Sequence, residues 1–336
     1  MMMSNTISVS CASDHNYLCG LWVTLHSLCN HCSSGYTLNI HILDCGLTSE
    51  DKSHLRKLES TFQHCSVKLS FHVANLDAFK DLSSWRGSHA AYARLLLQDI
   101  LADENYTIYT DVDMLWERDV AELWRMQAED KVLWAATDGS SVKLHASGKE
   151  RSAVARHEGF DFDEASYFCS GLLMMNLRRL REMNFGEHAK QFLKEQQAII
   201  AYCDQDCYNF LVPENEVGRI DFRWGVFSAV YGRRGEINTP AVIHYAARAP
   251  WSFKVKDNVA SDRWWRYLHN VAGCSVFGSE APLWRRKAYR IIFRYRVRST
   301  FLVRMLHRLV KARGAKKCEW RFAPEKFPFA PDELYE

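Results

Sequence analysis

The chain has 336 residues, 47% of them hydrophobic and 13% aromatic, and its formal net charge at pH 7 is +3. This length and apolar content suit one large domain, or one domain with an appendage, built around a substantial core. No run of 18 apolar residues occurs, and residues 1–16 lack the basic and apolar regions of a secretory signal. We therefore expect neither a membrane-spanning helix nor a secretory signal.

The charge is unevenly distributed along the chain. Residues 283–317 hold 13 of the 43 Lys and Arg and no Asp or Glu, which leaves 30 basic against 40 acidic residues elsewhere, a net of −10. An acidic body with one basic tail indicates a local anionic partner.

The 11 cysteines are odd in number and scattered from Cys11 to Cys318. They are most simply the reduced thiols of a cytosolic protein. Cys29 and Cys32 have the spacing of a zinc or redox pair, but no second ligand pair with suitable spacing accompanies them.

Predicted strands and helices alternate through the first half of the chain, which indicates a sheet of βαβ units. The strands are β-branched or alternating, and the helices have apolar residues at helical spacing. In chain order we predict a strand over Ile7–Ser13, a helix over Leu18–Leu28, a strand over Leu38–Leu43, a helix opening at Thr48–Asp51, a strand over Val67–His72, a helix over Ala90–Leu101, a strand over Tyr106–Thr110, a helix over Val120–Met126, a strand over Val132–Asp138, a polar excursion over 139–165, a buried strand over Tyr167–Leu177, a helix over Arg178–Gln197, a helix over Cys207–Leu211 and a strand over Ala241–Tyr245.

Polar residues follow the first predicted strand. A strand–loop–helix start places this loop at the carboxyl end of a parallel sheet, where ligands bind in open α/β folds. Asp14 and Asn16 are suited to hydrogen-bond a base or ribose, and Tyr17 is suited to stack on the base. Taken alone, however, Asp14 or Asn16 is better explained as a simple helix cap.

Two aspartates one residue apart, Asp111 and Asp113, follow the strand Tyr106–Thr110. Two carboxylates at the end of a buried strand repel each other and lose hydration, and a hard divalent cation removes that cost. A cation held in this way grips a diphosphate and neutralises charge as the phosphate leaves. The tripeptide alone fits a solvated turn better, but the preceding strand and the motifs below favour a metal site.

Arg94 lies inside the otherwise apolar helix predicted over Ala90–Leu101. Two interpretations remain open at this point. The side chain either extends to the surface along its apolar stem, or it directs a cation at the carboxylates of the next strand or at a substrate.

In this order and spacing, the motifs resemble those of glycosyltransferase family 8, which are retaining nucleotide-sugar enzymes of the GT-A fold. Within that family the chain is most similar to bacterial galactosyl- and glucosyltransferases that extend lipooligosaccharide and lipopolysaccharide cores. The resemblance runs from about Ile7 to Trp251. It is carried by Ala12-Ser-Asp14-His-Asn16-Tyr17, Tyr92-Ala-Arg94-Leu, Tyr109-Thr-Asp111-Val-Asp113, Asp138, Tyr167-Phe-Cys-Ser170-Gly171, Asn176-Leu, Asp204-Gln205-Asp206, His244-Tyr245 and Pro250-Trp251.

The resemblance implies an α/β GT-A fold with a mixed, mostly parallel central sheet, and roles for individual residues. It implies that uracil and ribose are held by Ala12, Asp14, Asn16 and Tyr17. It implies that Mn²⁺, or Mg²⁺, is bound by Asp111, Asp113 and His244. It implies that the donor sugar is lined by Arg94, Asp138, Ser170, Gly171 and Asp204, with Gln205 beneath the anomeric carbon. The expected contacts to the nucleotide sugar also include Arg86, Val112, Ala247 and Arg248.

The chain departs from the family pattern at two motifs. Cys169 precedes Ser170-Gly171 where relatives commonly have Asn, which removes an amide near the acceptor. The run after Tyr245 is one residue shorter than in relatives and lacks their phosphate-gripping lysine. Arg248 is the expected substitute, because a guanidinium binds phosphate in a bidentate manner.

These features predict transfer of glucose or galactose from a UDP-sugar to a hydroxyl with retention of configuration. Double displacement requires a carboxylate nucleophile at the anomeric carbon, whereas the matching residue here is the amide Gln205. We therefore expect attack on the same face as departure, with the leaving phosphate accepting the proton. The metal and Arg248, with Arg86 as an alternative, would stabilise the UDP leaving group, and Asp204 is the alternative nucleophile.

The tail is expected to form a basic amphipathic helix or helix pair that lies on an anionic membrane surface. We accordingly divide the chain into a catalytic domain, 1–255, and a C-terminal helical region, 256–336. The predicted protein is cytoplasmic, peripheral on the inner face of the membrane, and acts on a lipid-linked oligosaccharide. Packing of the tail on the body remains open, and nucleic acid is not the expected partner because no nucleic-acid fold accompanies the charge.

Two alternatives to this function remain. One keeps the chemistry and changes the acceptor to a protein or a soluble glycan. The other is a degenerate transferase that only binds nucleotide sugar or membrane, which Cys169 and the missing lysine favour and which the intact Asp111, Asp113, His244 and Gln205 oppose.

Overall fold

The computed structural model of the chain describes residues 5–82, 88–137, 167–197, 200, 202–228, 231, 239–246, 249–250 and 259–270. Four of the predicted site residues lie outside this range, namely Arg86, Asp138, Ala247 and Arg248. The basic segment 283–317 also lies outside the described residues.

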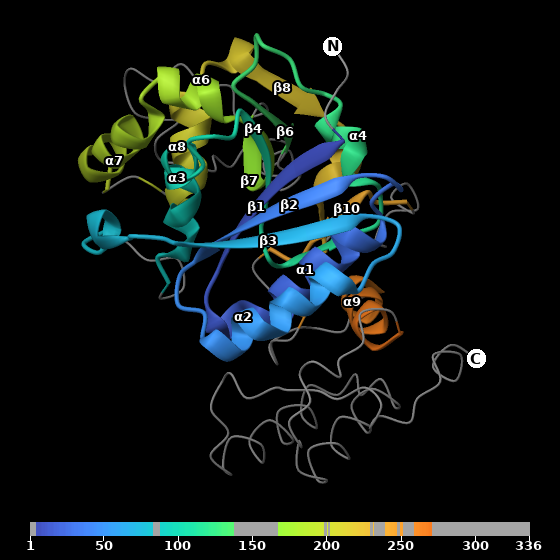
Figure 1. Cartoon of the computed structure of the whole chain (residues 1–336). Coiled ribbons are helices and arrows are strands. Elements are labelled where there is room, and N and C mark those ends of the chain that lie inside the picture. The colour runs from blue at the N-terminus through green and yellow to red at the C-terminus, as the bar shows by residue number, and fades with distance from the viewer. Residues whose placement is uncertain are drawn as a thin grey trace, which may run out of the picture.

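A central sheet has the strand order β3-β2-β1-β4-β7-β6-β8 (Figure 1). Its strands are β1 (Thr6–Ser13), β2 (Thr37–Asp44), β3 (Ser66–Val73), β4 (Tyr106–Thr110), β6 (Leu133–Thr137), β7 (Phe168–Asn176) and β8 (Val217–Ile220). Strand β7 runs antiparallel to β4 and β6, whereas the other four pairs are parallel. The mixed, mostly parallel α/β sheet predicted from the sequence is confirmed.

Alternation along the strands divides the interior into two apolar cores. Because successive strand residues point to opposite faces, Ile108 enters one core and Tyr109 enters the other. The same alternation continues across the neighbouring strand β7, where Met174 joins the first core and Leu173 the second. Both faces of the sheet are therefore covered at these strands, as is usual where parallel strands are joined through helices.

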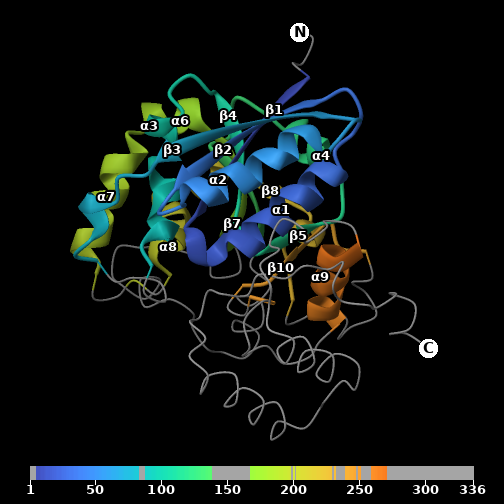
Figure 2. The same ribbon diagram turned by 60° about the horizontal axis from the view of Figure 1, so that its bottom comes forward.

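Helices cover the two faces in separate groups. In Figures 1 and 2, α1 and α2 lie across β1, β2 and β3, while α3, α6, α7 and α8 form a group of their own. The first core takes apolar residues from α1, α2, α4 and α9, and the second takes them from α3, α6, α7 and α8. The helices are α1 (Leu18–Asn30), α2 (Ser49–Leu55), α3 (Leu97–Ile100), α4 (Val120–Trp124), α6 (Leu177–Glu182), α7 (Phe185–Glu195), α8 (Cys203–Leu211) and α9 (Val259–Asn270).

A second, three-stranded sheet has the order β5-β10-β9. Its strands are β5 (Met114–Trp116), β9 (Val226–Phe227) and β10 (Val242–His244). Helix α1 fastens β5 with two buried hydroxyls, because Thr24 Oγ1 donates to Met114 O at 2.8 Å and Ser27 Oγ accepts from Trp116 N at 3.0 Å. These bonds satisfy backbone groups of a short strand that would otherwise be buried without partners.

Helix α9 fastens the same small sheet from a distant part of the sequence. Trp264 and Leu268 of α9 lie in the first core, and Tyr245 Oη donates to Ala260 O at 2.6 Å. Arg263 forms a bidentate ion pair with Glu117, the residue that follows β5. Segments far apart in the described chain thus hold β5 and β10 in place.

Two predicted helices differ from the structure. The segment predicted as one helix over Ala90–Leu101 is mostly a tighter 3₁₀ helix, η4 (Ala90–Leu96), followed by the short α3. The helix predicted over Arg178–Gln197 is broken into α6 and α7, because Asn184 adopts a left-handed conformation with φ 49°. A left-handed residue cannot continue a right-handed helix, and Asn tolerates that conformation better than most residues.

Along the described part of the chain, no helix has both the length and the apolar character required to cross a membrane.

Candidate active site

The sheet order places a ligand-binding edge at the end of β1 and β4. After β1 the chain continues to β2 and β3 on one side and then returns to β4 on the other side of β1. The carboxyl ends of β1 and β4 therefore flank a point where the strand order reverses, and such points bind ligands in open α/β sheets. Asp14–Tyr17 follows β1, and Asp111 follows β4.

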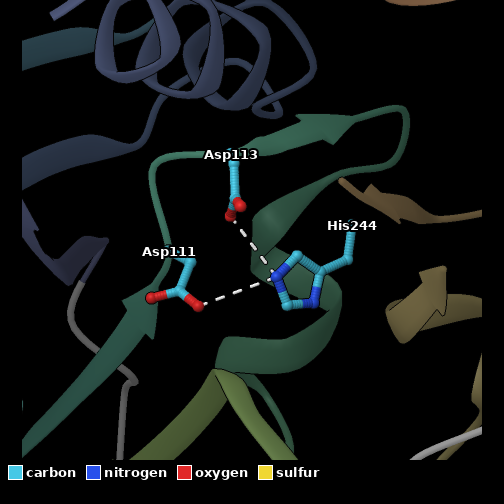
Figure 3. Close-up of side chains that lie close together, drawn as sticks. All are labelled: Asp111, Asp113 and His244. Carbon is cyan, nitrogen blue, oxygen red and sulfur yellow. Dashed lines mark ion pairs between the residues drawn. The ribbon is translucent and has the colours of Figure 1, made fainter. Parts of the chain in front are cut away.

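Three side chains converge at this edge (Figure 3). Nε2 of His244 lies 3.3 Å from Asp113 Oδ1 and 3.7 Å from Asp111 Oδ2. One ligand atom of each residue lies within 4.8 Å of the others. The cluster joins the end of β4, the start of β5 and the end of β10, although His244 is 133 positions from Asp111 in the chain.

Backbone hydrogen bonds fix the segments that carry these side chains. The N–H of Asp111 donates to Gly171 O at 2.7 Å, and the N–H of Tyr245 donates to Asp113 O at 2.8 Å. His244 is directly opposite Met114 in the antiparallel pair of β10 with β5. The site is thus built on strand ends rather than on free loops, which favours a defined geometry.

Gly171 leaves the space that this cluster occupies. A Cβ atom at residue 171 would lie 2.6 Å from His244 Cε1, 2.8 Å from Asp111 Oδ2 and 2.9 Å from Met114 Cε. These separations are shorter than van der Waals contact, so the close backbone approach expected at Ser170-Gly171 is present and requires glycine.

Arg94 is buried, with 5% of its surface exposed, and it connects the cluster to α8. Its Nη2 donates to Asp111 Oδ1 at 2.7 Å, and its Nε lies 3.0 Å from Asp204 Oδ2. Its Nη1 donates to Ser170 O at 2.7 Å and to Ser170 Oγ at 3.1 Å. Of the two interpretations of Arg94, the structure selects the cation aimed at carboxylates, and the surface interpretation is wrong.

No role was predicted for Tyr109 from the sequence, yet it supports both partners of this ion pair. Its hydroxyl donates to Asp111 Oδ1 at 3.1 Å, and the Arg94 guanidinium lies 4.4 Å from the centre of its ring. A cation over an aromatic face is attracted by the ring electrons. The signal in the sequence is the alternation of side chains along a strand. Tyr109 and Asp111 are two residues apart, so their side chains point to the same side.

Asp204 and Gln205 lie in the first turn of helix α8, and both bond to Ser170. The Oε1 of Gln205 accepts from Ser170 N at 3.1 Å, and Asp204 Oδ2 accepts from Ser170 Oγ at 2.9 Å. The Nε2 of Gln205 is buried and has no hydrogen-bond partner among the described residues. An orphaned buried amide carries a desolvation cost, and a bound ligand with an acceptor removes that cost.

The remaining predicted residues are placed as follows. Asp14 is the N-cap of a 3₁₀ turn, His15–Tyr17, and its side chain accepts from Asn16 N at 2.8 Å, so the capping explanation holds for Asp14. Asn16 is exposed and Tyr17 is half-buried on the same loop. Ala12 and Val112 are buried in the second and first cores, respectively.

Burial and the neighbouring charges shift several pKa values at this edge. Burial raises the pKa of Asp204 to about 6, against the opposing effect of Arg94. Burial also raises the pKa of Asp111, again opposed by Arg94. Burial alone would lower the pKa of His244, but Cys169 and Asp113 outweigh it and raise that pKa well above its ordinary value. The raised pKa of His244 means that the folded site favours the protonated imidazole beside Cys169 and Asp113, whereas the rise at Asp111 follows chiefly from its loss of hydration.

The residues present fit a divalent cation. Asp111, Asp113 and Asp204 contribute three carboxylates, and Arg94 contributes one guanidinium, so two negative charges remain when all four are ionised and His244 is neutral. Arg94 and Tyr109 occupy Oδ1 of Asp111, which leaves Oδ2 directed at His244. Two carboxylate oxygens and an imidazole form an oxygen and nitrogen donor set that suits Mn²⁺ and accommodates Mg²⁺ less well.

The family is decided by a match to the model of glycosyl transferase family 8, which covers residues 8–254. The chain belongs to glycosyltransferase family 8. This membership makes the chain a glycosyltransferase by family, as the motifs predicted.

Sequence relatives agree with the family. The chain is 27% identical over 208 residues to a putative glycosyltransferase of Haemophilus influenzae, covering 61% of this chain and 59% of the relative. It is 24% identical over 280 residues to general stress protein A of Bacillus subtilis, covering 77% of this chain and 92% of the relative. The match with the Haemophilus protein thus spans less than two thirds of that relative's length.

Solved structures share the fold. The galactosyltransferase LgtC, solved in complex with donor and acceptor sugar analogues, superposes with a TM-score of 0.61 at 20% identity, covering 84% of this chain and 99% of LgtC. The bifunctional glycosyltransferase WbbM superposes with a TM-score of 0.60 at 18% identity, covering 75% of this chain and 48% of WbbM. At these identities the likeness confirms a GT-A-like fold and no finer property.

Proposed function

We propose that the protein is a retaining hexosyltransferase that uses Mn²⁺ and moves glucose or galactose from a UDP-sugar to a hydroxyl group. The observation that carries this proposal is the Asp111–Asp113–His244 cluster at the switch point of the sheet, next to the orphaned amide of Gln205. Asp111, Asp113 and His244 would hold the cation. When bound, it supplies neutralisation of the charge that develops on the diphosphate leaving group.

The contacts of Asp204 support attack on the same face as departure. Double displacement would need a free carboxylate at the anomeric carbon. Asp204 is buried, lies 3.0 Å from Arg94 Nε and accepts from Ser170 Oγ, so its charge is already committed to internal partners. Gln205 is an amide and a poor nucleophile. The leaving phosphate would therefore take the proton from the attacking hydroxyl.

Gln205 would stabilise the reacting sugar rather than bond to it. Its Oε1 is fixed by the backbone N–H of Ser170, which leaves Nε2 as the group that meets the donor. A fixed dipole of this kind stabilises charge in the transition state without reorganising. Arg94 would hold the site in position, because both of its carboxylate partners, Asp111 and Asp204, belong to it.

The proposed contacts to the nucleotide sugar come from the end of β1 and the loop after it, from Val112, and from Ser170 and Gly171 of β7. Asp14, Asn16 and Tyr17 would contact uracil and ribose, supported by the position of their loop at the carboxyl edge. Ala12, Val112, Ser170 and Gly171 would line the same donor site. Arg86, Asp138, Ala247 and Arg248 remain proposed contacts in segments outside the described residues.

We further propose a lipid-linked oligosaccharide of the lipopolysaccharide core type as the acceptor, presented at an anionic membrane surface. The support is the charge of 283–317, where 13 basic residues and no acidic ones occur. Each basic residue near such a surface contributes about 1 kcal/mol of binding free energy. Under this proposal the enzyme is cytoplasmic and peripheral on the inner face of the membrane. Residues 1–255 form the catalytic domain, which α9 completes by packing in the first core, and the rest of 256–336 is a helical appendage.

UDP release from a panel of UDP-sugars tests the chemistry. We expect slow hydrolysis of UDP-glucose or UDP-galactose with Mn²⁺, abolished by EDTA and by Asp113→Ala. Turnover of one UDP-hexose identifies the donor and leaves only the acceptor to be found. Intact UDP binding without turnover of any donor, even with acceptor glycolipid present, would instead support a protein that binds nucleotide sugar without transferring it.

A further inference from the structure

The imidazole of His244 has a second neighbour on the side away from the aspartates. The Sγ of Cys169 lies 3.6 Å from His244 Nδ1, within hydrogen-bond distance for sulfur. Cys169 belongs to β7 and is half-buried. From the sequence, Cys169 was interpreted as the loss of an amide near the acceptor and as support for a degenerate transferase. The structure instead brings its sulfur against a candidate metal ligand.

A backbone bond shows that the sulfur of Cys169 serves as an acceptor. The N–H of Gly171 donates to Cys169 Sγ at 3.4 Å, so the sulfur already acts as an acceptor. A thiol sulfur is a weak acceptor with room for a second donor. A cation on Nε2 requires the ring proton to be on Nδ1, and the Nδ1 N–H of His244 is then the group placed to supply that donor. With the proton on Nδ1, the lone pair of the ring is on Nε2, which is the nitrogen that faces Asp111 and Asp113.

The other neighbours of the ring restrain its position without choosing a nitrogen. The ring of Phe227 lies 5.3 Å from the imidazole, centre to centre, and Gly171 approaches it closely at Cε1. Neither group offers a side-chain hydrogen bond. Within the described ranges, Cys169 Sγ is the hydrogen-bond partner that the structure gives to Nδ1, so the thiol distinguishes the two ring nitrogens on that side.

We propose that Cys169 is a positioning residue for the metal ligand His244, and that its sulfur sets the affinity of the site for a divalent cation. This inference rests on the proposed function, because it requires the Asp111–Asp113–His244 cluster to bind a cation. Metal-ligating histidines generally donate their other ring N–H to a carboxylate, a carbonyl or water, which fixes the tautomer and the ring orientation. Here the thiol of Cys169 is the acceptor of that N–H.

Binding of Mn²⁺ to the whole 336-residue chain, measured from the electron paramagnetic resonance signal of free Mn²⁺, tests the proposal without any sugar transfer. Cys169→Val removes the acceptor at similar volume, and Cys169→Ala removes it without adding volume. Above the raised pKa of His244, where no proton competes with the cation, both variants should weaken Mn²⁺ binding roughly tenfold, the lower end of the range for losing such a partner. Cys169→Ser, which keeps an acceptor, should bind Mn²⁺ within about threefold of the wild type, since a hydroxyl preserves the tautomer.

Two comparisons separate positioning from general damage. Cys65→Val replaces a buried thiol beside the start of β3, remote in sequence from Cys169, and should leave Mn²⁺ affinity unchanged. When Cys169→Val is combined with His244→Asn, it should cause no loss beyond that of His244→Asn alone, because the imidazole through which the sulfur acts is gone. An equal further loss in the double variant would assign Cys169 a merely structural role and overturn the proposal.

The outcomes distinguish the inference from the function beneath it. Wild-type protein that binds Mn²⁺ and loses it on Asp113→Ala, with Cys169→Val and Cys169→Ala both binding like the wild type, overturns the inference alone. Wild-type protein that does not bind Mn²⁺, or binds it equally well after Asp113→Ala, overturns the proposed metal site and the inference together.

Discussion

Arg94 Nη2 donates to Asp111 Oδ1 at 2.7 Å, while Oδ2 of the same carboxylate faces His244. Oδ1 of Asp111 is therefore bonded within the protein, and Oδ2 is available to the proposed cation. The same guanidinium pairs with Asp204, so Arg94 connects the proposed cation ligands to the helix that carries Gln205.

Removal of the Arg94 guanidinium should destabilise the fold strongly. Arg94→Gln leaves Asp111 and Asp204 without their buried cation, and breaking a buried pair from one side costs about 3–5 kcal/mol of unfolding free energy. Urea denaturation measures the change. Arg178→Gln, which removes an arginine ion-paired on the surface with Glu182, is the matched control and should cost under about 1 kcal/mol. A cost for Arg94→Gln no larger than that of the control would contradict the buried network.

Gly171→Ala should abolish cation binding while leaving most of the fold intact. The added Cβ would lie 2.6 Å from His244 Cε1 and 2.8 Å from Asp111 Oδ2, so at least one ligand must move. Mn²⁺ affinity and UDP-sugar hydrolysis measure the effect. The control is Gly225→Ala, whose Cβ meets its nearest neighbour, Ala136 Cβ, at 3.2 Å and touches no proposed ligand. Wild-type Mn²⁺ affinity in Gly171→Ala would show that the ligand set is wrong.

Gln205→Ala should lower kcat with little change in the binding of Mn²⁺ and UDP. The orphaned Nε2 is proposed to act on the reacting sugar, and losing one fixed donor of this kind typically costs about 10²–10³ in kcat. Asn209→Ala, one helical turn further along α8, removes another buried amide that bonds the backbone of Phe168 and serves to gauge indirect effects on β7. If Gln205→Ala weakens UDP binding as much as it lowers kcat, the residue holds the nucleotide rather than the reacting centre.

Mn²⁺ affinity should rise with pH through neutrality and continue to rise above it. The folded pKa of His244 is raised well above 6.5, so its proton competes with the cation until the pH exceeds that raised value. In the metal-free protein, the same shift contributes stability that is fully present below about pH 6.5 and is lost as the pH rises through the folded pKa. Mn²⁺ titrations at several pH values check the slope, which approaches about tenfold per pH unit for one competing proton. A slope that already flattens at about pH 6.5, the ordinary pKa of histidine, would contradict the raised pKa.

Charge reversal in the basic segment should release the protein from anionic membranes. Arg290→Glu, Arg294→Glu and Arg298→Glu together remove three positive charges and add three negative ones. With about 1 kcal/mol for each basic residue at the surface, cosedimentation with vesicles of anionic lipid should fall about a hundredfold or more in apparent affinity. Vesicles of neutral lipid are the control. Unchanged cosedimentation with anionic vesicles would remove the membrane proposal and leave the catalytic one untouched.

The sequence allowed prediction of those parts of the fold that have a period or a cap. Strand β4 occupies Tyr106–Thr110 as predicted, and Thr48 caps α2 with a reciprocal bond to Asp51. Strands β5 and β9 were missed because three and two residues are too few to show alternation. The break at Asn184 was missed because a single left-handed residue leaves the polar helical pattern on both sides intact.

The candidate site likewise has residues that the sequence predicts and contacts that it does not. Asp111 and Asp113 can be found in the sequence because they follow a strand directly, whereas the partners of Arg94 depend on a contact with Asp204 across 110 positions of chain. The contact between Cys169 and His244 likewise depends on tertiary packing, because the two residues are 75 positions apart in the chain. Local patterns carry no information on such pairs, and only the family resemblance had grouped most of these residues.

The distance along the chain between Asp111 and His244 also sets when the proposed cation site comes into being. Ribosomes add about 5–20 residues per second, so His244 is added to the growing chain roughly ten seconds after Asp111 and Asp113. During that interval β1 to β4 have been synthesised, but His244 and the helix α9 that fastens the small sheet have not. A nascent chain therefore cannot assemble the cluster before β10 is made, and the capacity to bind a cation is acquired in one late step of synthesis.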